Sequence, residues 1–442
     1  MKLNRANLAA MNHVESSKAT ERIVHIGLGA FHRAHQAWYT ARVDRKQEWG
    51  IVAFTGRSAD AAAKLSSQDG LYTLITRDAN GDSYQIIDSI VRAEDGNDTE
   101  AFVEVVANSQ TAIITLTITE AGYGMDALGH VDTNNPPAAL HRLAVALETR
   151  RRASGLGIAV VSCDNMPSNG SLLKIAMSDL FSTFGPEALA WLNEKVSFVS
   201  TSIDRITPKT VESDLALVEQ ATGWQDSAPV VTEPFSDWVL EGEFPLGRPQ
   251  WERAGAKFVE NIEPFENRKL WMLNGSHSLM AYLGQLRGHE TVAEAIADDF
   301  CRKQVEAFWD EAANHLKEPG LDIPKYRSAL IDRYQNPRIA HRLGQIAIDG
   351  ATKLRVRVAP VAKAEITNAR TASACATAIA SWVAYVLKNE KVADSQIEEI
   401  TRALKGDKAG VEQRLVSVID LQLANDQKFM ALVIEKLATL KI

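Results

Sequence analysis

The chain has little of several features that mark well-known protein classes. Its 442 residues include only three cysteines, Cys163, Cys301 and Cys375, which lie far apart. An odd number of widely spaced cysteines argues against a disulfide framework and favours a reducing, cytoplasmic setting. No apolar stretch reaches the roughly 20 residues that span a bilayer. The first residues also lack the continuous apolar segment of a secretory signal.

Excess positive charge is missing as well. Lysine and arginine total 48 against 56 aspartates and glutamates, which gives a net charge of -8. This balance argues against a nucleic-acid surface. There is no C-x-x-C pair, and the ten histidines show no H-x-x-x-H spacing on a predicted helix. The sequence therefore predicts no metal site and neither a nucleic acid nor a membrane as partner.

What is present is the composition of a globular chain large enough for two domains. Hydrophobic residues make up 45% and charged residues 24%, and a single hydrophobic core rarely grows to 442 residues. In the first 200 residues, short apolar segments alternate with segments of helical period. The predicted strands are residues 22–29, 50–54, 111–119, 156–164 and 196–204, and the predicted helices are residues 33–45, 101–109, 136–152 and 170–184. This alternation predicts an α/β fold with a mostly parallel sheet covered on both faces.

Two other segments complete the predicted organisation. Residues 71–78 and 83–92 alternate in polarity around Asn80-Gly81, a strong turn signal, so we expect an antiparallel hairpin inserted in the sheet domain. From about Pro264 onward, alanine, leucine and charged residues recur at helical spacing. We therefore expect a Rossmann-type dinucleotide-binding domain at 1–262 and an α-helical substrate-binding and catalytic domain at 263–442.

A glycine turn follows the first predicted strand in "GLGAFHRAH". Gly27 permits a tight turn, and Gly29 lets the backbone approach a pyrophosphate at the start of a helix. His32 stands where a strict fingerprint has its third glycine, so helix and strand should pack less closely. A plain tight turn would look similar, but the position after a strand favours a dinucleotide. Ala30, Phe31 and, at the end of a later strand, Thr119 are further candidates for cofactor contact.

The end of the second strand bears on the choice between NAD and NADP. An acidic residue there would bind the adenosine ribose of NAD, whereas an arginine can accommodate a 2′-phosphate. This chain has "FTGRSAD", with Arg57 and Ser58 before Asp60. Arg57 is thus either a 2′-phosphate ligand or an ordinary surface arginine, and both cofactors remain open at this point.

The segment "ENRKLWMLNGSHSLMAYLG", residues 266–284, reads as a buried helix that contains three polar side chains. With 100° per residue and Lys269 as zero, His277 falls at about 80° and Asn274 at about 140°, all on one side. Separate partners for each are the alternative, but three at convergent spacing favour a site. A desolvated lysine is a suitable base for a secondary alcohol, and asparagine amides can hold the developing alkoxide. Gly275 in mid-helix suggests that something approaches closely.

Other dehydrogenase chemistries lack their residues in this chain. None of the eight tyrosines is followed by lysine four positions later, so the Tyr-x-x-x-Lys pair is absent. A cysteine-rich zinc cluster is absent too. A metal-free, lysine-based site is what remains.

Several motifs together resemble the polyol-specific long-chain dehydrogenases, the mannitol dehydrogenase family. They are "GLGAFHRAH", "TITEAGY", "SCDNMPSNG", "DRITP", "GRPQWERAGAKFV" and "KLWMLNGSHS". The resemblance runs from about residue 22 to the C-terminus. It implies an NAD-dependent, metal-independent oxidoreductase, with NADP as a further possibility. Its implied site residues are Lys269 as general base, Asn165 and Asn274 for the reacting oxygen, His277 for substrate hydroxyls, Glu120 as proton outlet, and Asp204 and Lys353 as substrate contacts. Alternatively, Asp204 pairs only with Arg205, and Asn165 caps a helix.

One position departs from the mannitol 2-dehydrogenase pattern. These enzymes commonly carry an arginine eight residues before the lysine that matches Lys353, and here Gln345 stands there as a candidate substrate contact. The surrounding "GQIAIDG" resembles the fructuronate reductase branch, which implies D-mannonate and D-fructuronate as substrates. The carboxylate of such a substrate needs a cationic partner, for which Lys353, Arg357 and another arginine all remain open. Mannitol 2-dehydrogenase or an arabinitol-type enzyme is the alternative, and a non-catalytic redox sensor is a distant one. A monomer and a small homo-oligomer are both compatible with the sequence.

Overall fold

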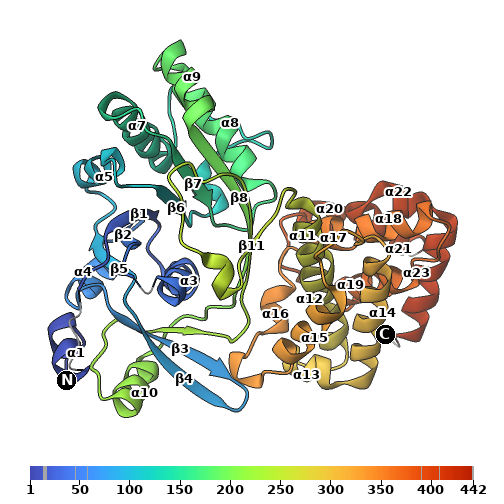
Figure 1. Ribbon diagram of the computed structural model, residues 1–442. Coiled ribbons are helices and arrows are strands. Elements are labelled where there is room, and N and C mark those ends of the chain that lie inside the picture. Colours follow the sequence, from blue (N-terminus) through green and yellow to red (C-terminus); the bar gives the residue numbers. More distant parts are fainter. Residues whose placement is uncertain (13–16, 45, 57, 390, 408, 441–442) are drawn as a thin grey trace. The chain divides into compact units, whose positions relative to one another are not determined.

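A computed structural model describes residues 1–12, 17–44, 46–56, 58–389, 391–407 and 409–440. The chain divides into two compact units, a sheet unit of Met1–Glu263 and a helical unit of Pro264–Ile442. Each unit is treated by itself below. Figure 1 labels many of the helices and strands of both units.

The sheet unit is built around an eight-stranded sheet with the order β11-β10-β8-β7-β6-β1-β2-β5. The six strands from β8 to β5 run parallel, and β10 joins β8 antiparallel. Numbered along the chain, these six strands have the order 3-2-1-4-5-6 of dinucleotide-binding folds. The order reverses between β1 and β6. A ligand crevice is therefore expected at the carboxyl ends of these two strands, and the predicted α/β class is confirmed.

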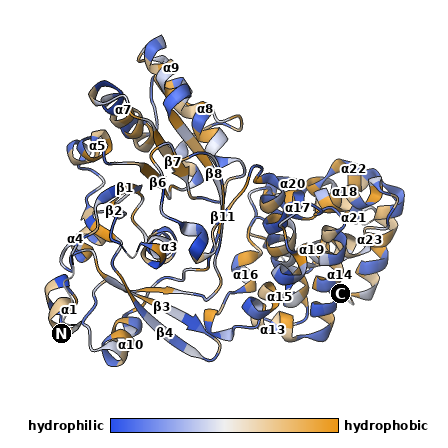
Figure 2. Ribbon diagram, viewed as in Figure 1, coloured by the Kyte–Doolittle hydropathy of each residue, from blue (hydrophilic) through white to orange (hydrophobic). Residues whose placement is uncertain are grey.

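The strands lie close to the apolar segments predicted for them. They are β1 (Glu21–Ile26), β2 (Gly50–Phe54), β5 (Ile90–Glu94), β6 (Ile113–Leu116), β7 (Ile158–Ser162), β8 (Val196–Asp204), β10 (Asp237–Glu241) and β11 (Lys257–Phe258). Figure 2 shows hydrophobic colours along β6 and β7. Alternate strand residues enter two cores, so Ile23 faces one layer and Val24 the other. Burial on both faces explains the nearly continuous apolar runs.

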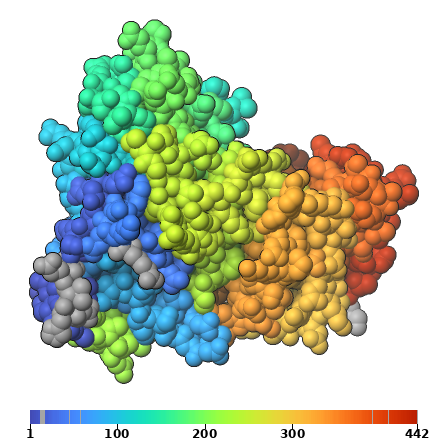
Figure 3. Space-filling model, viewed as in Figure 1, coloured from blue at the N-terminus to red at the C-terminus, as the bar shows by residue number. Residues whose placement is uncertain are grey.

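Helices cover both faces of this sheet. One core packs the sheet against α5 (Thr99–Ala107), α7 (Ala138–Ala153), α8 (Asn169–Ser182) and α9 (Pro186–Lys195). The other core includes α2 (Ala30–Ala34), α3 (Gln36–Val43), α4 (Asp60–Ser66) and η1 (Trp251–Ala254). The helix predicted at 33–45 is thus two helices that meet at His35. The remaining helices are α1 (Arg5–Asn12), α6 (Glu120–Tyr123) and α10 (Glu212–Thr222). The segment after β8, yellow-green in Figure 3, covers one face of this unit.

The predicted hairpin forms, but it is not part of the main sheet. Strand β3 (Tyr72–Asp78) pairs antiparallel with β4 (Gly81–Ile87), and β9 (Val230–Thr232) adds to β3 in parallel. The segment predicted as one strand at 83–92 is divided. Its last residues begin β5, which pairs with β2 in the main sheet. A short strand of three residues such as β9 carries too little pattern to be recognised in the sequence.

The helical unit contains one helical run followed by shorter helices packed around it. The run is α11 (Glu263–Arg268), η2 (Lys269–Gly275) and α12 (Ser276–Leu286). The other helices are α13 (Val292–Ala297), α14 (Asp299–Ala313), α15 (Ile323–Tyr334), η3 (Pro337–Ile339), α16 (Leu343–Ile346), α17 (Gly350–Arg357), α18 (Ala359–Thr367), α19 (Ser373–Lys388), α20 (Ile397–Leu404), α21 (Val411–Ile419), α22 (Leu421–Asn425) and α23 (Gln427–Thr439). Almost every residue of α12 is buried. Among the helices in the described part of the chain, none is long and apolar enough to cross a membrane.

Candidate active site

The glycine turn has the geometry that a dinucleotide requires. Gly27 has a φ of 101°, and a Cβ there would lie 2.3 Å from the carbonyl oxygen of Thr117. The Thr117 hydroxyl also donates to the Gly27 carbonyl at 2.8 Å, which ties the ends of β1 and β6 together. A Cβ on Gly29 would meet only the Gly27 carbonyl, at 3.6 Å. The chain therefore leaves open the space before Gly29, where a pyrophosphate would approach, with Ala30 and Phe31 opening α2 beside it.

A stack of histidines replaces the third glycine of the turn. The His32 ring lies on the His25 ring at a centroid distance of 3.3 Å, and both side chains are fully buried. The His25 Nδ1 is 2.8 Å from the Thr115 hydroxyl. Burial lowers the pKa of His25 to about 3 and that of His32 well below its usual value. Both rings are therefore neutral, and helix and strand meet through an imidazole pair instead of a close glycine contact.

A cavity of about 790 Å³ opens at this edge of the sheet. It is lined by Phe31, Thr119, Glu120 and Asn165 among other residues, so four predicted site residues of the sheet unit share one cavity. Thr119 is the residue before α6 and Glu120 begins that helix. The position at the strand carboxyl ends and the size suit a small ligand or part of a dinucleotide.

Asn165 does not cap the helix that follows it. Helix α8 starts at Asn169 after Ser168, and Asn165 lies in the preceding loop, exposed to the cavity. Asn169 instead holds this loop in place. Its Nδ2 is 3.1 Å from the Thr201 carbonyl and 3.2 Å from the Asp164 carboxylate, and its Oδ1 accepts from Thr201 N at 2.9 Å. The alternative role of Asn165 as a helix cap is wrong.

The Asp164 carboxylate adds a second tether to the Asn165 loop. It is largely buried and accepts from the Tyr123 hydroxyl at 2.6 Å and from Met166 N at 2.9 Å. The pKa of Tyr123 is raised well above its usual value by burial and by this carboxylate, so the phenol stays protonated and donates. The position of Asn165 is therefore set on both sides by buried polar contacts.

Asp204 ends β8, where its backbone pairs with Asp237 of β10. The alternative that it pairs with Arg205 does not hold. The Arg205 guanidinium donates instead to the carbonyl oxygens of Ala34 at 2.5 Å and Glu233 at 3.2 Å, and it lies over the Trp38 ring. Arg57, the candidate reader of a 2′-phosphate, lies outside the described residues.

The helix with the three polar residues is not α-helical throughout. Lys269–Gly275 forms a π-helix between α11 and α12. In an α-helix, residues five apart diverge by about 140°. In a π-helix the backbone hydrogen bonds join residues five apart. Lys269 and Asn274 are five apart, so they lie one turn from each other along the helix. The predicted angles were therefore wrong, and the correction brings these two side chains closer to one face. π-Helical turns occur frequently at functional sites.

Side-chain donors, one from the run itself and three from outside it, satisfy the carbonyl groups that the widened turn leaves available. The Met272 carbonyl accepts from the Ser276 hydroxyl at 2.5 Å and from Trp309 Nε1 at 2.8 Å. The Leu273 carbonyl accepts from the Tyr334 hydroxyl at 3.3 Å. The Asn274 carbonyl accepts from Arg357 at 3.3 Å. Because buried backbone groups must be paired, these donors stabilise the π-helix in place of α-helical bonds.

Gly275 is required for a close contact, as its mid-helix position suggested. A Cβ there would lie 2.6 Å from Cε1 and 2.8 Å from Cζ of Phe308 on α14. The Phe308 side chain is fully buried, so it has little room to move away. The glycine lets α14 pack directly against the end of the π-helix.

His277 lies in a cationic but dry environment. It is 7% exposed, and its ring is 4.9 Å from the rings of Tyr334 and His341. Burial and then the charges of His341, Arg333 and Arg357 hold the pKa of His277 well below its usual value. The ring is therefore neutral near pH 7 and offers one donor and one acceptor, which suits a substrate hydroxyl.

Lys353 and Gln345, the two remaining predicted substrate contacts, differ in their surroundings. Lys353 on α17 is partly buried, and its Nζ donates to the Ile346 carbonyl at 3.0 Å. Burial and the nearby Arg357 lower the pKa of Lys353. Gln345 lies on the four-residue α16 and its side chain is exposed.

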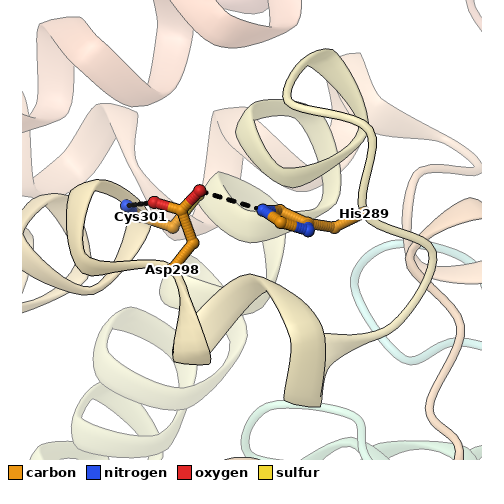
Figure 4. Close-up of side chains that lie close together, drawn as sticks. All are labelled: His289, Asp298 and Cys301. Atoms are coloured by element: carbon orange, nitrogen blue, oxygen red, sulfur yellow. Dashed lines mark hydrogen bonds and ion pairs between the residues drawn. The ribbon is translucent and has the colours of Figure 1, made fainter.

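One group of side chains in the helical unit has metal-ligand chemistry. The potential ligand atoms of His289, Asp298 and Cys301 lie within 4.8 Å of one another (Figure 4). The Asp298 carboxylate, however, already accepts from Arg287 at 2.8 Å, from His289 at 3.0 Å and from two backbone amides at the start of α14. Burial raises the pKa of the Cys301 thiol to about 12. This cluster is a charged helix cap, and a cation would have to displace Arg287.

We accordingly expect activity without an added metal. Prolonged dialysis against a chelator should leave the turnover number unchanged, because the lysine base and amide donors expected from the sequence would need no Lewis acid. The measurement is the rate of NADH formation before and after dialysis, with total metal followed by mass spectrometry. Loss of activity that zinc restores would contradict the metal-free site.

The glycine turn at the switch point of a 3-2-1-4-5-6 sheet, with polar residues gathered on a buried helix, defines a nicotinamide-dependent oxidoreductase. Comparison with known families agrees with this class. The Rossmann-domain model of mannitol dehydrogenase matches residues 21–253, and the model of the C-terminal domain matches residues 261–441. The chain belongs to the mannitol dehydrogenase family, which confirms the resemblance noted in the sequence.

Individual relatives carry two kinds of name. D-mannonate oxidoreductase of Escherichia coli (strain K12) is 37% identical over 393 residues, which is 84% of this chain and 81% of the relative. A mannitol 2-dehydrogenase of Aspergillus fumigatus is 35% identical over 447 residues, covering 93% and 88%. Among solved structures, Pseudomonas fluorescens mannitol 2-dehydrogenase with NAD and D-mannitol is 30% identical, with a TM-score of 0.78 over 100% of this chain and 97% of that one.

Sequence reasoning missed the residues that support the site. Thr117, Asp164 and Asn169 were not singled out for the geometry that they provide. The Asn169-Gly170 pair in the sequence was a possible sign of a close approach at this point. In the structure, a Cβ on Gly170 would lie 2.6 Å from Ser200 N. That glycine lets α8 approach β8 and brings Asn169 into bonding range.

Proposed function

We propose that the protein interconverts a secondary alcohol of an open-chain sugar acid with its ketone, with D-mannonate and D-fructuronate as the lead pair. The observation that supports the chemistry is the Lys269–Gly275 π-helix, in which Lys269 and Asn274 are one turn apart and after which α12 carries the buried, neutral His277. The relative named D-mannonate oxidoreductase supports the substrate. D-mannitol and D-fructose are the competing pair, supported by the mannitol 2-dehydrogenase relatives.

Each residue has one proposed task in oxidation. Lys269 accepts the hydroxyl proton, and the Asn165 and Asn274 amides donate to the oxygen as its negative charge grows. Hydrogen bonds aimed at this charge stabilise the transition state more than the bound alcohol. His277 orients neighbouring hydroxyls, and Asp204, Lys353 and Gln345 contact the rest of the substrate. Glu120, exposed at the cavity of the sheet unit, passes the proton to solvent.

The cofactor we propose is NAD. Such a cofactor, when bound, would supply the chemistry of hydride transfer. The sheet unit fits a dinucleotide because Gly27 turns sharply and the space before Gly29 is open. Ala30, Phe31 and Thr119 lie at the same edge and would contact it, and Arg57 is the residue to examine for NADP. Fluorescence titration with NADH and NADPH tests this choice, and tighter NADPH binding that is lost in Arg57→Ala would contradict it.

The three thiols support a proposal for the cellular setting. Cys163, Cys301 and Cys375 are free and buried. Burial raises the pKa of each thiol, so all three stay protonated and unreactive. We propose a reducing, cytoplasmic compartment, with small molecules as the only partners that the site requires.

A substrate panel tests the proposed function. We expect the specificity constants for D-mannonate oxidation and D-fructuronate reduction to exceed those for D-mannitol and D-fructose. Simple alcohols should react poorly, because each buried polar group left unpaired costs about 1–3 kcal/mol. If the specificity constants for D-mannitol and D-fructose are instead about tenfold higher, roughly 1.4 kcal/mol in transition-state free energy, the hexonate assignment is wrong. If the enzyme turns over no sugar alcohol and no sugar acid, the result favours the alternative of a non-catalytic redox sensor.

A further inference from the structure

Two cations lie together on one short helix of the helical unit. Lys353 and Arg357 are four residues apart on α17, so their side chains share a face. Arg357 Nη1 donates to the Asn274 carbonyl at 3.3 Å and to the Ser278 hydroxyl at 3.1 Å. It is thus in direct contact with the helical run that carries Lys269, Asn274 and His277.

No carboxylate of the described chain pairs with either cation. The contacts of Lys353 and Arg357 there are with two carbonyl groups and one hydroxyl. The acids nearest to Lys353 are engaged elsewhere. Asp394 accepts from Ala351 N and Gln396 N, both at 2.9 Å, and Asp349 accepts from Ser395 N at 2.8 Å. Burial lowers the pKa of the Arg357 guanidinium to about 10, which still leaves it charged at pH 7.

A partly buried guanidinium without an anion is costly, since only hydrogen bonds and a nearby counter-charge offset its desolvation. Arginine is also the side chain whose planar donors match a carboxylate in bidentate fashion. A neutral hexitol would leave this charge uncompensated, whereas a hexonate would bring its own anion. The uncharged Gln345 on the neighbouring α16 is exposed and offers no alternative positive charge.

We propose that Arg357, assisted by Lys353, binds the terminal carboxylate of the substrate and is the residue that selects sugar acids over polyols. This inference rests on the proposed function, because it assumes that Asn274 and His277 bind the reacting end of the same molecule. It assigns Arg357 to specificity and not to proton transfer. It also explains why the guanidinium is held beside Asn274 by backbone and hydroxyl acceptors and not by an acid of the protein.

The test combines a variant with a substrate that lacks the charge. Arg357→Gln should lower the specificity constant for D-mannonate by roughly a hundredfold, mostly through KM, because a charge-assisted bidentate contact is lost. D-mannitol activity should fall by a smaller factor, which reflects only the lost support of the Asn274 carbonyl, so the ratio of the two specificity constants should fall by about tenfold or more. D-mannonamide lacks the negative charge of D-mannonate. The wild type should therefore use D-mannonamide with a specificity constant as low as that of Arg357→Gln for D-mannonate. Arg357→Lys should recover part of the loss.

Arg355→Gln is the matched control. Arg355 lies on the same helix, but its guanidinium donates to the Ile419 and Val418 carbonyls at 3.0 and 2.7 Å. Its removal should leave the ratio of D-mannonate to D-mannitol activity unchanged. The amide measurement needs no variant, so it keeps the proposal testable even if Arg357→Gln fails to fold.

The outcomes separate the two proposals. Equal losses on D-mannonate and D-mannitol in Arg357→Gln would show that the arginine only supports Asn274, and would overturn its role in specificity. A wild type that accepts D-mannonamide as well as D-mannonate would overturn it too. A wild type that strongly prefers D-mannitol would instead overturn the hexonate assignment, and the carboxylate role of Arg357 with it.

Discussion

Lys269→Ala should reduce the turnover number by roughly 10²–10⁴, the usual contribution of a positioned general base. KM for the substrate and the Kd for NADH should stay close to wild type, because the lysine acts mainly on a proton that moves in the transition state. Stopped-flow measurement of NADH formation together with fluorescence titration gives both quantities. Small primary amines should restore part of the rate by occupying the vacated space.

Lys303→Ala is the control for this experiment. Lys303 is an exposed lysine on α14 of the same unit, so its loss should change neither quantity. If Lys269→Ala raised KM with an unchanged turnover number, the lysine would be a binding residue and another group would have to be the base. The asparagine and histidine assignments do not depend on this result.

Alanine at either glycine of the cofactor turn should weaken NADH binding, but only at Gly27 should it also lower the stability of the fold. Gly27→Ala places a Cβ 2.3 Å from the Thr117 carbonyl at a φ of 101°. Strain and overlap together should cost roughly 2–5 kcal/mol in the free energy of unfolding, and NADH binding should be lost with the turn. Thermal denaturation and NADH titration are the measurements.

Gly29→Ala is the matched variant. Its φ is -135° and the nearest atom to a Cβ is 3.6 Å away, so stability should be within about 0.5 kcal/mol of wild type. The Kd for NADH should nevertheless rise, since the added methyl occupies the space before the turn. A Gly29→Ala enzyme with normal NADH affinity would show that the pyrophosphate does not approach this residue.

The sequence was informative where burial determines the residue types. Strand β2 at Gly50–Phe54 and strand β8 at Val196–Asp204 match their predicted bounds. In β2 the reason is burial on both faces, which requires apolar residues throughout. Strands β9 and β11, with three and two residues, have too few positions to show a pattern. The family resemblance and the α/β class were recognised from motifs and alternation, and the comparisons confirm both.

The π-helix could not be predicted from periodicity. Its stability depends on donors far along the chain, Trp309, Tyr334 and Arg357, which supply hydrogen bonds to Met272, Leu273 and Asn274. Such tertiary contacts have no local signature, so the sequence suggested an ordinary α-helix with its polar residues about 140° and 80° from Lys269. The mid-helix Gly275 was the one local sign that the run is unusual, and its explanation lies in Phe308.

The same limit applies to Arg357. The sequence offers it only as one possible partner of a substrate carboxylate, beside Lys353 and other arginines. The structure adds that it lies next to Asn274 and Ser278 and pairs with no acid of the described chain. Gln345 was recognised as a departure from a family pattern, but its exposed position on a four-residue helix was not foreseeable. Charge and burial together, and not residue type alone, identify the candidate specificity residue.

The most direct test of the account follows the hydride itself. D-mannonate with deuterium on the carbon that is oxidised is incubated with the enzyme and NAD, and the reduced cofactor is analysed by mass spectrometry. The account predicts that each NADH formed by the wild type carries one deuterium. Lys269→Ala should form NADH much more slowly than the wild type. Deuterium released to solvent, or no reduced cofactor from any sugar acid or polyol, would contradict it.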